Sequence, residues 1–163
     1  MKNSEMTKLV KEAIKEFKIE NQKQEKKQVY HNTRLLLRHY NDLQEHILDA
    51  VDNINQMECD IDIHELNEDD LYILSIKQSK VKTLIMLAHI DVSLEKLKQK
   101  QIKLGTVEKY RALEMFYFQG KTYEQIQEEL HCGLGTPGRW VNQMVNQLSI
   151  YLFGIDGLKQ MLK

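Results

Sequence analysis

Helix-breaking residues are almost missing from the first two thirds of this chain. Its 163 residues include one proline, Pro137, and seven glycines, and every glycine lies at Gly105 or beyond. Many-stranded β folds need glycine and proline at frequent turns, so a segment 1–104 with neither residue argues against such folds. The sequence therefore predicts an all-α fold.

Signals of secretion, disulfide bonding and membrane insertion are missing as well. The two cysteines, Cys59 and Cys132, are far apart and belong to no C-x-x-C pair, which fits a reducing compartment. No apolar stretch approaches the roughly 18 residues that span a bilayer. No apolar segment of a signal peptide follows the N-terminal lysines. We expect a cytoplasmic protein that has no membrane partner.

Patterns typical of enzymes and of metal sites are also lacking. The six histidines are scattered, without a Ser-His-Asp, His-Glu-x-x-His or phosphate-loop arrangement. The group Asp60, Asp62, His64 and Glu65 lacks the glycine turn and the later glutamate of a calcium loop. We therefore expect no catalytic activity, no cofactor and no bound metal.

The charge is small in total but unevenly placed. The formal net charge is −1: residues 1–40 hold ten Lys/Arg and five Glu (+5), and residues 41–104 hold seven Lys/Arg and thirteen Asp/Glu (−6). Residues 105–163 hold six of each sign and are neutral. A neutral segment lacks the basic footprint that is typical of nucleic-acid-binding domains.

Residues 1–104 carry two apolar stripes at helical spacing. The first predicts an amphipathic helix over residues 5–19 and consists of Met6, Leu9, Val10, Ala13, Ile14 and Phe17. The second alternates steps of four and three like a coiled-coil seam: Leu36, Tyr40, Leu43, Ile47, Ala50, Ile54 and Met57. This seam fits a helical hairpin within one chain as well as it fits a homodimer.

A third predicted helix begins after Asn67, a good N-cap that is followed by three acidic residues. It would continue to Leu104, where Gly105 ends it, and would be roughly 50 Å long at ~1.5 Å per residue. Its expected buried side consists of Leu74, Val81, Leu84, Ile85, Leu87, Ala88, Val92, Leu94 and Leu97. Residues 1–104 are therefore interpreted as an elongated helical hairpin that dimerises or contacts a partner.

Residues 105–163 predict a compact unit of three helices. Thr106 can cap a helix over 107–119, and the sequence from Thr122 to Gln125 has the form of a capping box that opens a short second helix. A third helix would begin late, with Thr136 as N-cap and Pro137 at the first helical position, and would end at Gly154. This order and these lengths are typical of a helix-turn-helix domain.

The third helix carries polar side chains at the spacing of one face. Arg139, Asn142, Gln143 and Asn146 could read base edges, since Arg pairs with guanine and Asn or Gln with adenine. Thr136, at the start of the same helix, is also included in the predicted DNA-binding set. Lys121, Thr122 and Tyr123, at the start of the second helix, could bind a phosphate. A merely solvated face, and a packing role for Tyr123, remain open alternatives.

The C-terminal segment resembles a known family of regulators. The stretch from Glu108 (EKYRALEMFYFQGKTYEQIQEELHC) and the stretch from Trp140 (WVNQMVNQLSIYLFG) are similar to phage transcriptional regulators of the ArpU/RinA type. The C-terminal part of that family looks like sigma factor region four. The resemblance implies an activator of late phage genes that binds double-stranded DNA and contacts RNA polymerase. It carries over Lys121, Thr122 and Tyr123, and the face from Arg139 to Asn146.

One part of the chain departs from that family. Relatives usually have a Ser cap and several basic or polar residues where this chain has Gly133-Leu-Gly-Thr-Pro-Gly138. This difference shortens the helix tip that would enter a DNA groove. Two hypotheses follow: a sequence-specific DNA-binding regulator, or a sigma-like module that binds RNA polymerase or another regulator without reading DNA.

Overall fold

The computed structural model describes residues 2–48, 67–77 and 79–160, which form seven helices and no strand. The predicted all-α class is confirmed. The helices are α1 (Lys2–Arg38), α2 (Tyr40–Leu48), α4 (Glu68–Lys77), α5 (Lys80–Leu104), α6 (Val107–Tyr117), α7 (Tyr123–Leu130) and α8 (Thr136–Gln160). None of these helices is long and apolar enough to cross a lipid bilayer.

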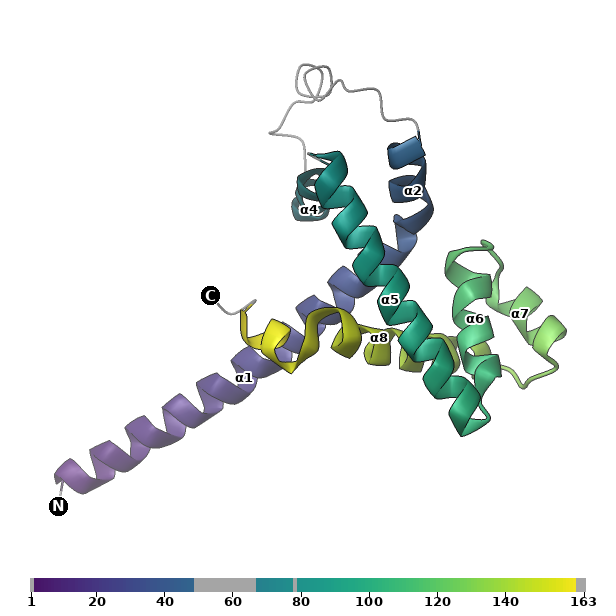
Figure 1. Cartoon of the computed structure of the whole chain (residues 1–163). Helices are drawn as coiled ribbons and strands as arrows, with labels where there is room; N and C mark the ends of the chain where they lie inside the picture. The colour runs from purple at the N-terminus through teal and green to yellow at the C-terminus, as the bar shows by residue number, and fades with distance from the viewer. Residues whose placement is uncertain (1, 49–66, 78, 161–163) are drawn as a thin grey trace.

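The first helix, α1, has two parts with different surroundings. Its N-terminal part projects away from the other helices, whereas its C-terminal part passes behind α8 (Figure 1). Residues 3–24 are exposed throughout, and Val29, Leu35, Leu36 and Leu37 are buried. The amphipathic helix predicted over residues 5–19 is therefore present, but its apolar stripe is exposed to solvent.

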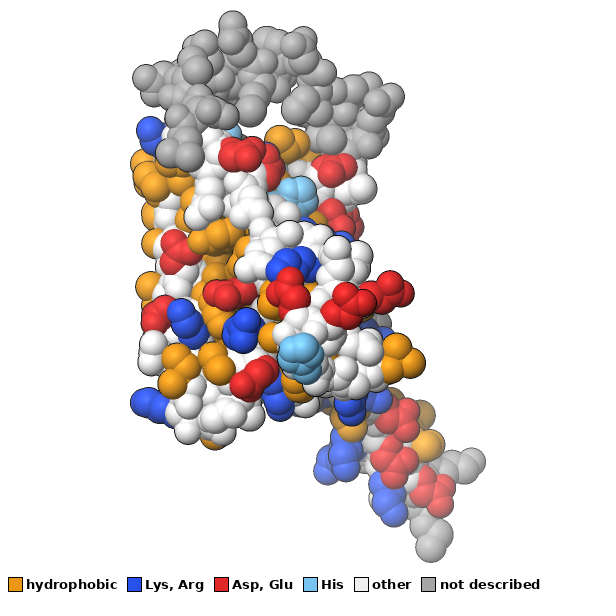
Figure 2. All heavy atoms as spheres, turned by 90° about the vertical axis from the view of Figure 1, so that its right-hand side faces the viewer, with side chains coloured by type: hydrophobic (Ala, Val, Ile, Leu, Met, Phe, Trp, Pro, Cys, Tyr) orange, Lys and Arg blue, Asp and Glu red, His pale blue; other side chains and the backbone are white. Residues whose placement is uncertain are grey.

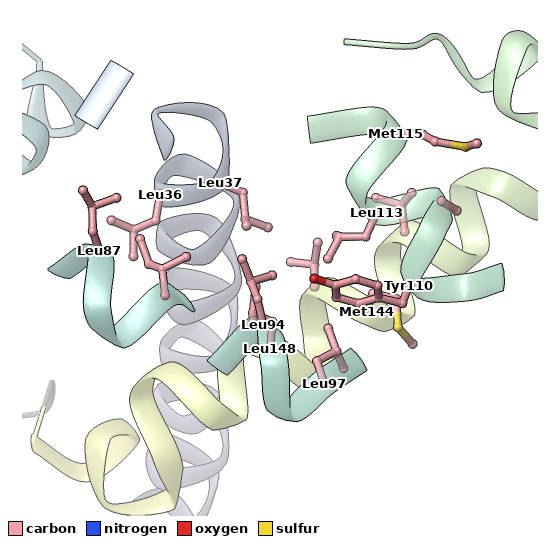
Figure 3. Packing of buried hydrophobic residues seen from close by; sticks show 14 of the residues in the cluster. Leu36, Leu37, Leu87, Leu94, Leu97, Tyr110, Leu113, Met115, Met144 and Leu148 are labelled. Atoms are coloured by element: carbon pink, nitrogen blue, oxygen red, sulfur yellow. The ribbon is translucent and has the colours of Figure 1, made fainter. Parts of the chain in front are cut away.

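The core lies where α8 meets the other helices. This helix packs against α1, α5, α6 and α7. Leucine and methionine side chains from four of these helices converge there, among them Leu36, Leu97, Leu113, Met144 and Leu148 (Figure 3). The core therefore includes residues on both sides of Gly105, which separates the predicted regions 1–104 and 105–163.

The continuous helix predicted between Asn67 and Leu104 is wrong, because the chain forms α4 and α5 instead. Asn67 does cap α4: its Oδ1 accepts from the Asp70 backbone N at 2.9 Å. Ser79 has extended backbone angles, and its side chain accepts from Lys82 N at 3.0 Å, so it begins a second helix. The predicted end at Gly105 is correct, since this residue has φ of 70° and forms the C-cap of α5.

The predicted buried side of α5 is only partly correct. Leu87, Leu94 and Leu97 are buried, and Leu74 of α4 is partly buried. The remaining members of the predicted set are exposed: Val81, Leu84, Ile85, Ala88 and Val92. This helix has apolar residues on two faces, and the sequence pattern alone does not say which face enters the core.

The elongated hairpin needed a continuous helix through the second stripe, and the structure interrupts that helix at His39. Leu36 of α1 and Leu43 of α2 are buried, while Tyr40 and Ile47 are partly buried. α2 packs against α5, whereas α1 packs mainly against α8. The other seam positions (Ala50, Ile54 and Met57) and the acidic group at Asp60, Asp62, His64 and Glu65 lie outside the described residues.

Candidate nucleic-acid interface

The second helix of the C-terminal unit, α7, begins as predicted. Thr122 Oγ1 accepts from Gln125 N at 3.2 Å, and Gln125 Oε1 accepts from Thr122 N at 3.0 Å. This reciprocal capping box satisfies two backbone donors at the helix start. Ile126 then anchors α7 in the core, where it is fully buried. The capping box and the packing of α7 against α6 and α8 fix the position at which α7 crosses the unit.

The first helix of the unit, α6, begins differently from the prediction. Thr106 precedes Val107 but makes no side-chain cap hydrogen bond. Its hydroxyl instead donates to Gln101 Oε1 of α5 at 2.6 Å. α6 also ends at Tyr117 rather than Gln119, and Gly120 follows with φ of 66°. The Thr106 hydroxyl therefore joins α5 to α6 instead of capping α6.

The turn before α8 contains two residues with positive φ, His131 (51°) and Gly135 (77°). The helix begins at Thr136, one residue before the predicted first helical position, and Gly135 O accepts the first helical bond, from Arg139 N at 3.3 Å. Gly135 therefore occupies the capping position predicted for Thr136. Pro137 costs no hydrogen bond, because N–H groups in the first turn have no partner within the helix.

All four residues of the predicted reading face lie together on the outside of α8. Arg139, Asn142, Gln143 and Asn146 are exposed. The opposite side of the helix is buried and consists of Val141, Met144, Val145 and Leu148. Arg139 is also held in place by a hydrogen bond from Nη2 to Thr136 Oγ1 at 3.2 Å. α8 thus combines a buried apolar side with an accessible side that carries both donors and acceptors.

The three predicted phosphate ligands have other partners. Lys121 forms an ion pair with Glu129 at 2.5 Å, and the Thr122 hydroxyl is occupied by the capping box. The ring of Tyr123 stacks on Phe116 at 4.7 Å between centroids. It also lies against Gly138, where the Cβ of a larger residue would be 3.7 Å from the ring. Tyr123 therefore has the packing role that the sequence left open, although its side chain is 41% exposed.

Tyr30 of α1 contacts the reading face and Arg34 contacts Tyr30, and neither residue was predicted. Tyr30 Oη donates to Asn142 Oδ1 at 2.8 Å. Arg34 lies 5.8 Å from the centroid of the Tyr30 ring. A hydrogen bond with Tyr117 raises the pKa of Arg34, so the guanidinium group stays positively charged. Tyr30 and Asn142 are 112 positions apart, and no local spacing in the sequence could reveal such a contact.

The surface around this site has mixed charge. Acidic and basic side chains alternate on the side of the molecule that carries α6 and α7 (Figure 2). Glu124 and Glu128 are exposed on α7. Arg139 differs from Lys121, since no carboxylate of the described residues lies within salt-bridge distance of it. Basic character at this site therefore comes mainly from two arginines, Arg139 and Arg34.

The tip of the unit carries an exposed apolar side chain. Leu134 lies in the turn between α7 and α8 and is 89% exposed, in a position next to the first turn of α8.

Comparison with the profiles of known protein families, with characterised proteins and with solved structures finds no match for the chain.

Proposed function

We propose that the protein is a sequence-specific DNA-binding transcription regulator that reads base edges with the outer face of α8. The observation that carries this proposal is the exposure of Arg139, Asn142, Gln143 and Asn146 on a helix whose opposite side is buried in the core. A rigid helix holds these side chains in a fixed arrangement, and their chemistry suits bidentate contacts with guanine and adenine.

The proposal includes the role that the resemblance to ArpU/RinA regulators implies. In this role the protein activates late genes of a phage or prophage, and it contacts RNA polymerase while α8 lies in the major groove. Phosphate contacts are assigned to Arg34, which would keep its place beside Tyr30 and Tyr117, and to Lys121, which would exchange Glu129 for a phosphate.

The most direct mutational test is Arg139→Ala, measured by fluorescence anisotropy on the duplex that the protein prefers. Loss of a bidentate guanine contact should cost about 1–3 kcal/mol at that site and relax the preference at one base pair. Arg111→Ala is the matched control, since Arg111 is an exposed arginine on α6 and should bind as wild type does. Equal affinities of the Arg139 variant and the wild type would contradict the proposal.

A second candidate function is favoured by the acidic outer side of α7. Exposed Glu124 and Glu128 lie on the helix that would cross the DNA backbone, where their charge repels phosphates. A sigma-like module that binds RNA polymerase or another regulator through protein contacts would have no such penalty.

Salt dependence separates the two functions. DNA binding should weaken with a slope of about −0.9 in log K against log salt for each phosphate contact. A module that binds a protein partner only would show no saturable DNA binding at any salt concentration. Glu124→Gln with Glu128→Gln should strengthen DNA binding in the first case and weaken the protein complex in the second.

A further inference from the structure

The charge of the C-terminal unit leaves the proposed DNA contact incomplete. Residues 105–163 are neutral, whereas DNA-binding surfaces are usually basic, because binding replaces counterions at several phosphates. Residues 21–38 of α1 have the charge that this unit lacks, since they include five Lys/Arg and a single acidic residue, Glu25. This part of α1 packs against α8, so the positive charge lies beside the C-terminal unit in the folded protein (Figure 1).

Three of these basic residues form one side of α1. Lys23, Lys27 and Arg34 follow one another in steps of four and seven, which is the spacing of one helix face. Lys23 and Lys27 are exposed, and no carboxylate among the side chains that the structure describes lies within salt-bridge distance of the three. Glu25 is two positions from each lysine, so it lies on the opposite side of the helix, where it is partly buried. The basic side of α1 is therefore accessible to an anionic ligand.

Tyr30 connects the basic side of α1 to the reading face of α8. It follows Lys27 by three residues and precedes Arg34 by four, so it occupies the same side of α1. Its ring lies 5.8 Å from the Arg34 guanidinium, and its hydroxyl donates to Asn142 Oδ1 at 2.8 Å. The basic side of α1 and the exposed side of α8 therefore meet at one residue and can face the same duplex.

Arg34 also lies beside tyrosines of the C-terminal unit. Its guanidinium donates to the hydroxyl of Tyr117, at the end of α6, and this hydroxyl keeps its own proton for a further acceptor. The rings of Tyr117 and Tyr123 both lie against Phe116, at 4.9 and 4.7 Å between centroids. Burial raises the pKa of Tyr123, and nearby Arg34 offsets part of this rise, so the hydroxyl stays protonated. A phosphate beside Arg34 would find one guanidinium group and two hydroxyl donors.

We infer that the basic side of α1 binds the phosphate backbone of the duplex whose bases α8 reads, and that Arg34, Tyr117 and Tyr123 hold one of these phosphates. The inference rests on the proposed function, since it takes double-stranded DNA as the ligand. It adds a helix outside the helix-turn-helix unit to the contact. From Lys23 to Arg34 the basic side extends over about 17 Å at ~1.5 Å per residue, which is long enough to reach more than one phosphate.

The exposed residues of this part of α1 favour DNA over a membrane as the anionic partner. They are all polar or charged: Asn21, Gln22, Lys23, Gln24, Lys26, Lys27, Gln28, His31 and Arg38. A helix that lies on an anionic membrane needs an apolar face that enters the lipid. One acidic side chain borders the stretch, because Asp69 of α4 lies 2.8 Å from His31, on the edge away from Tyr30. A nucleic acid beside α8 fits this chemistry, and a lipid surface does not.

Salt dependence on a random-sequence duplex tests the two lysines. Lys23→Gln with Lys27→Gln should weaken binding and reduce the slope of log K against log salt by about 1.8, since each phosphate contact contributes about 0.9. Lys96→Gln with Lys100→Gln is the matched control. These lysines are also exposed and four residues apart, but they lie beside Tyr151, on the side of α8 away from the reading face. Equal slopes for the two double variants would overturn the inference.

Removal of two hydroxyls tests the phosphate site at Arg34. Tyr117→Phe with Tyr123→Phe keeps both rings and should lower the affinity for the same duplex about tenfold, because two hydrogen bonds to phosphate are lost. The salt slope should stay unchanged, since no charge is removed. Tyr151→Phe is the control and should bind as wild type does. Unchanged affinity of the double variant, with the fold verified by near-ultraviolet circular dichroism, would overturn the site.

These measurements separate the inference from the proposed function. A random-sequence duplex reports backbone contacts, whereas selection of a preferred base pattern reports reading by α8. The expected lysine and tyrosine effects without any preferred pattern would support the backbone contact and contradict base reading. A preferred pattern with unchanged binding by both double variants would overturn the inference and leave the proposed function standing. A wild type that binds anionic vesicles and no duplex would overturn both.

Discussion

The two parts of α1 have similar amphipathic sequences and opposite environments. Residues 3–24 are exposed along their whole length, although they include Leu9, Val10 and Phe17. Residues 29–37 pack against α8, and Leu36 is completely buried. The comparison shows that an apolar stripe indicates a helix face that can be covered, and leaves open whether the chain itself or a second molecule covers it.

The buried part of α1 differs from residues 3–24 in one further respect, because it has buried polar side chains where it packs against α8. Thr33 and Ser149 are both buried, and Ser149 Oγ donates to Thr33 Oγ1 at 2.8 Å. A hydrogen bond between α1 and α8 in a dry environment fixes the register of the two helices. Residues 3–24 form no such buried hydrogen bond to another described helix, because all of them are exposed.

Truncation of a leucine in each part should give the sharpest contrast. Leu36→Ala should lower the free energy of unfolding by about 2–5 kcal/mol, because it leaves a cavity in the core. Leu9→Ala, at a position that is 66% exposed, should change it by less than about 0.5 kcal/mol in the monomer. Urea denaturation at low protein concentration measures both values, and equal losses would contradict the division of α1.

Replacement of a threonine in each part tests the buried hydrogen bonds alone. Thr7 and Thr33 each donate to the carbonyl four residues earlier, at 2.7 and 2.8 Å. Thr33→Val should cost about 0.5–1.5 kcal/mol, because it removes the bond between α1 and α8 while the Ser149 hydroxyl can still donate to Val145 O at 2.7 Å. Thr7→Val should be nearly neutral, since water replaces its bond. Urea denaturation measures both free energies of unfolding. An unchanged value for Thr33→Val would show that the hydrogen bond between Thr33 and Ser149 does not stabilise the fold.

Removal of the Tyr30 hydroxyl tests how firmly α1 holds the reading face. Tyr30→Phe keeps the ring and removes the hydrogen bond to Asn142. Because this bond is exposed to solvent, the free energy of unfolding should fall by only about 0.5–1 kcal/mol. The Asn142 side-chain amide should shift in a ¹⁵N-¹H spectrum, while the amide of Gln147 on the same helix serves as an internal reference. An unchanged Asn142 signal would contradict the contact.

Acid titration should reveal a small contribution from the contact between α2 and α4. Lys77 Nζ lies 2.5 Å from Asp42 Oδ2 and holds the pKa of this carboxyl below its usual range. Stability from a lowered carboxyl pKa is present above the unfolded-state value and is lost as the pH falls through the folded-state value. Since the Asp42 side chain is 52% exposed, this contribution to the free energy of unfolding is only a few tenths of a kcal/mol. Asp42→Asn should make the loss of stability between neutral and acid pH smaller by about this amount.

Local features of the fold could be predicted well. Asn67, Thr122 and Gly105 act at the helix ends where the sequence placed them, because their capping partners are close in the sequence. Thr106 does not cap α6, since its hydroxyl donates to Gln101 of α5 instead. The exposed positions on α8 were predictable for the same reason, since the 3.6-residue period fixes which side chains share a face.

Features that depend on tertiary contacts could not be predicted. The outward side of α5 has the same apolar spacing as its inward side, and Val81 and Ile85 were assigned to the core although they are exposed. Ser79 begins a new helix where periodicity alone would continue the preceding one, and a serine is found both inside helices and at their N-caps. The place of Tyr30 beside Asn142 depends on how α1 crosses α8, which no local pattern encodes.

Selection of bound duplexes from a random double-stranded library tests most directly whether the outer face of α8 reads DNA. The wild-type protein should enrich a defined base pattern, and Gln143→Ala should alter that pattern at one or two adjacent positions while the rest persists. Recovery of no preferred sequence by the wild type, or an identical pattern with Gln143→Ala, Arg139→Ala and Asn146→Ala, would contradict it.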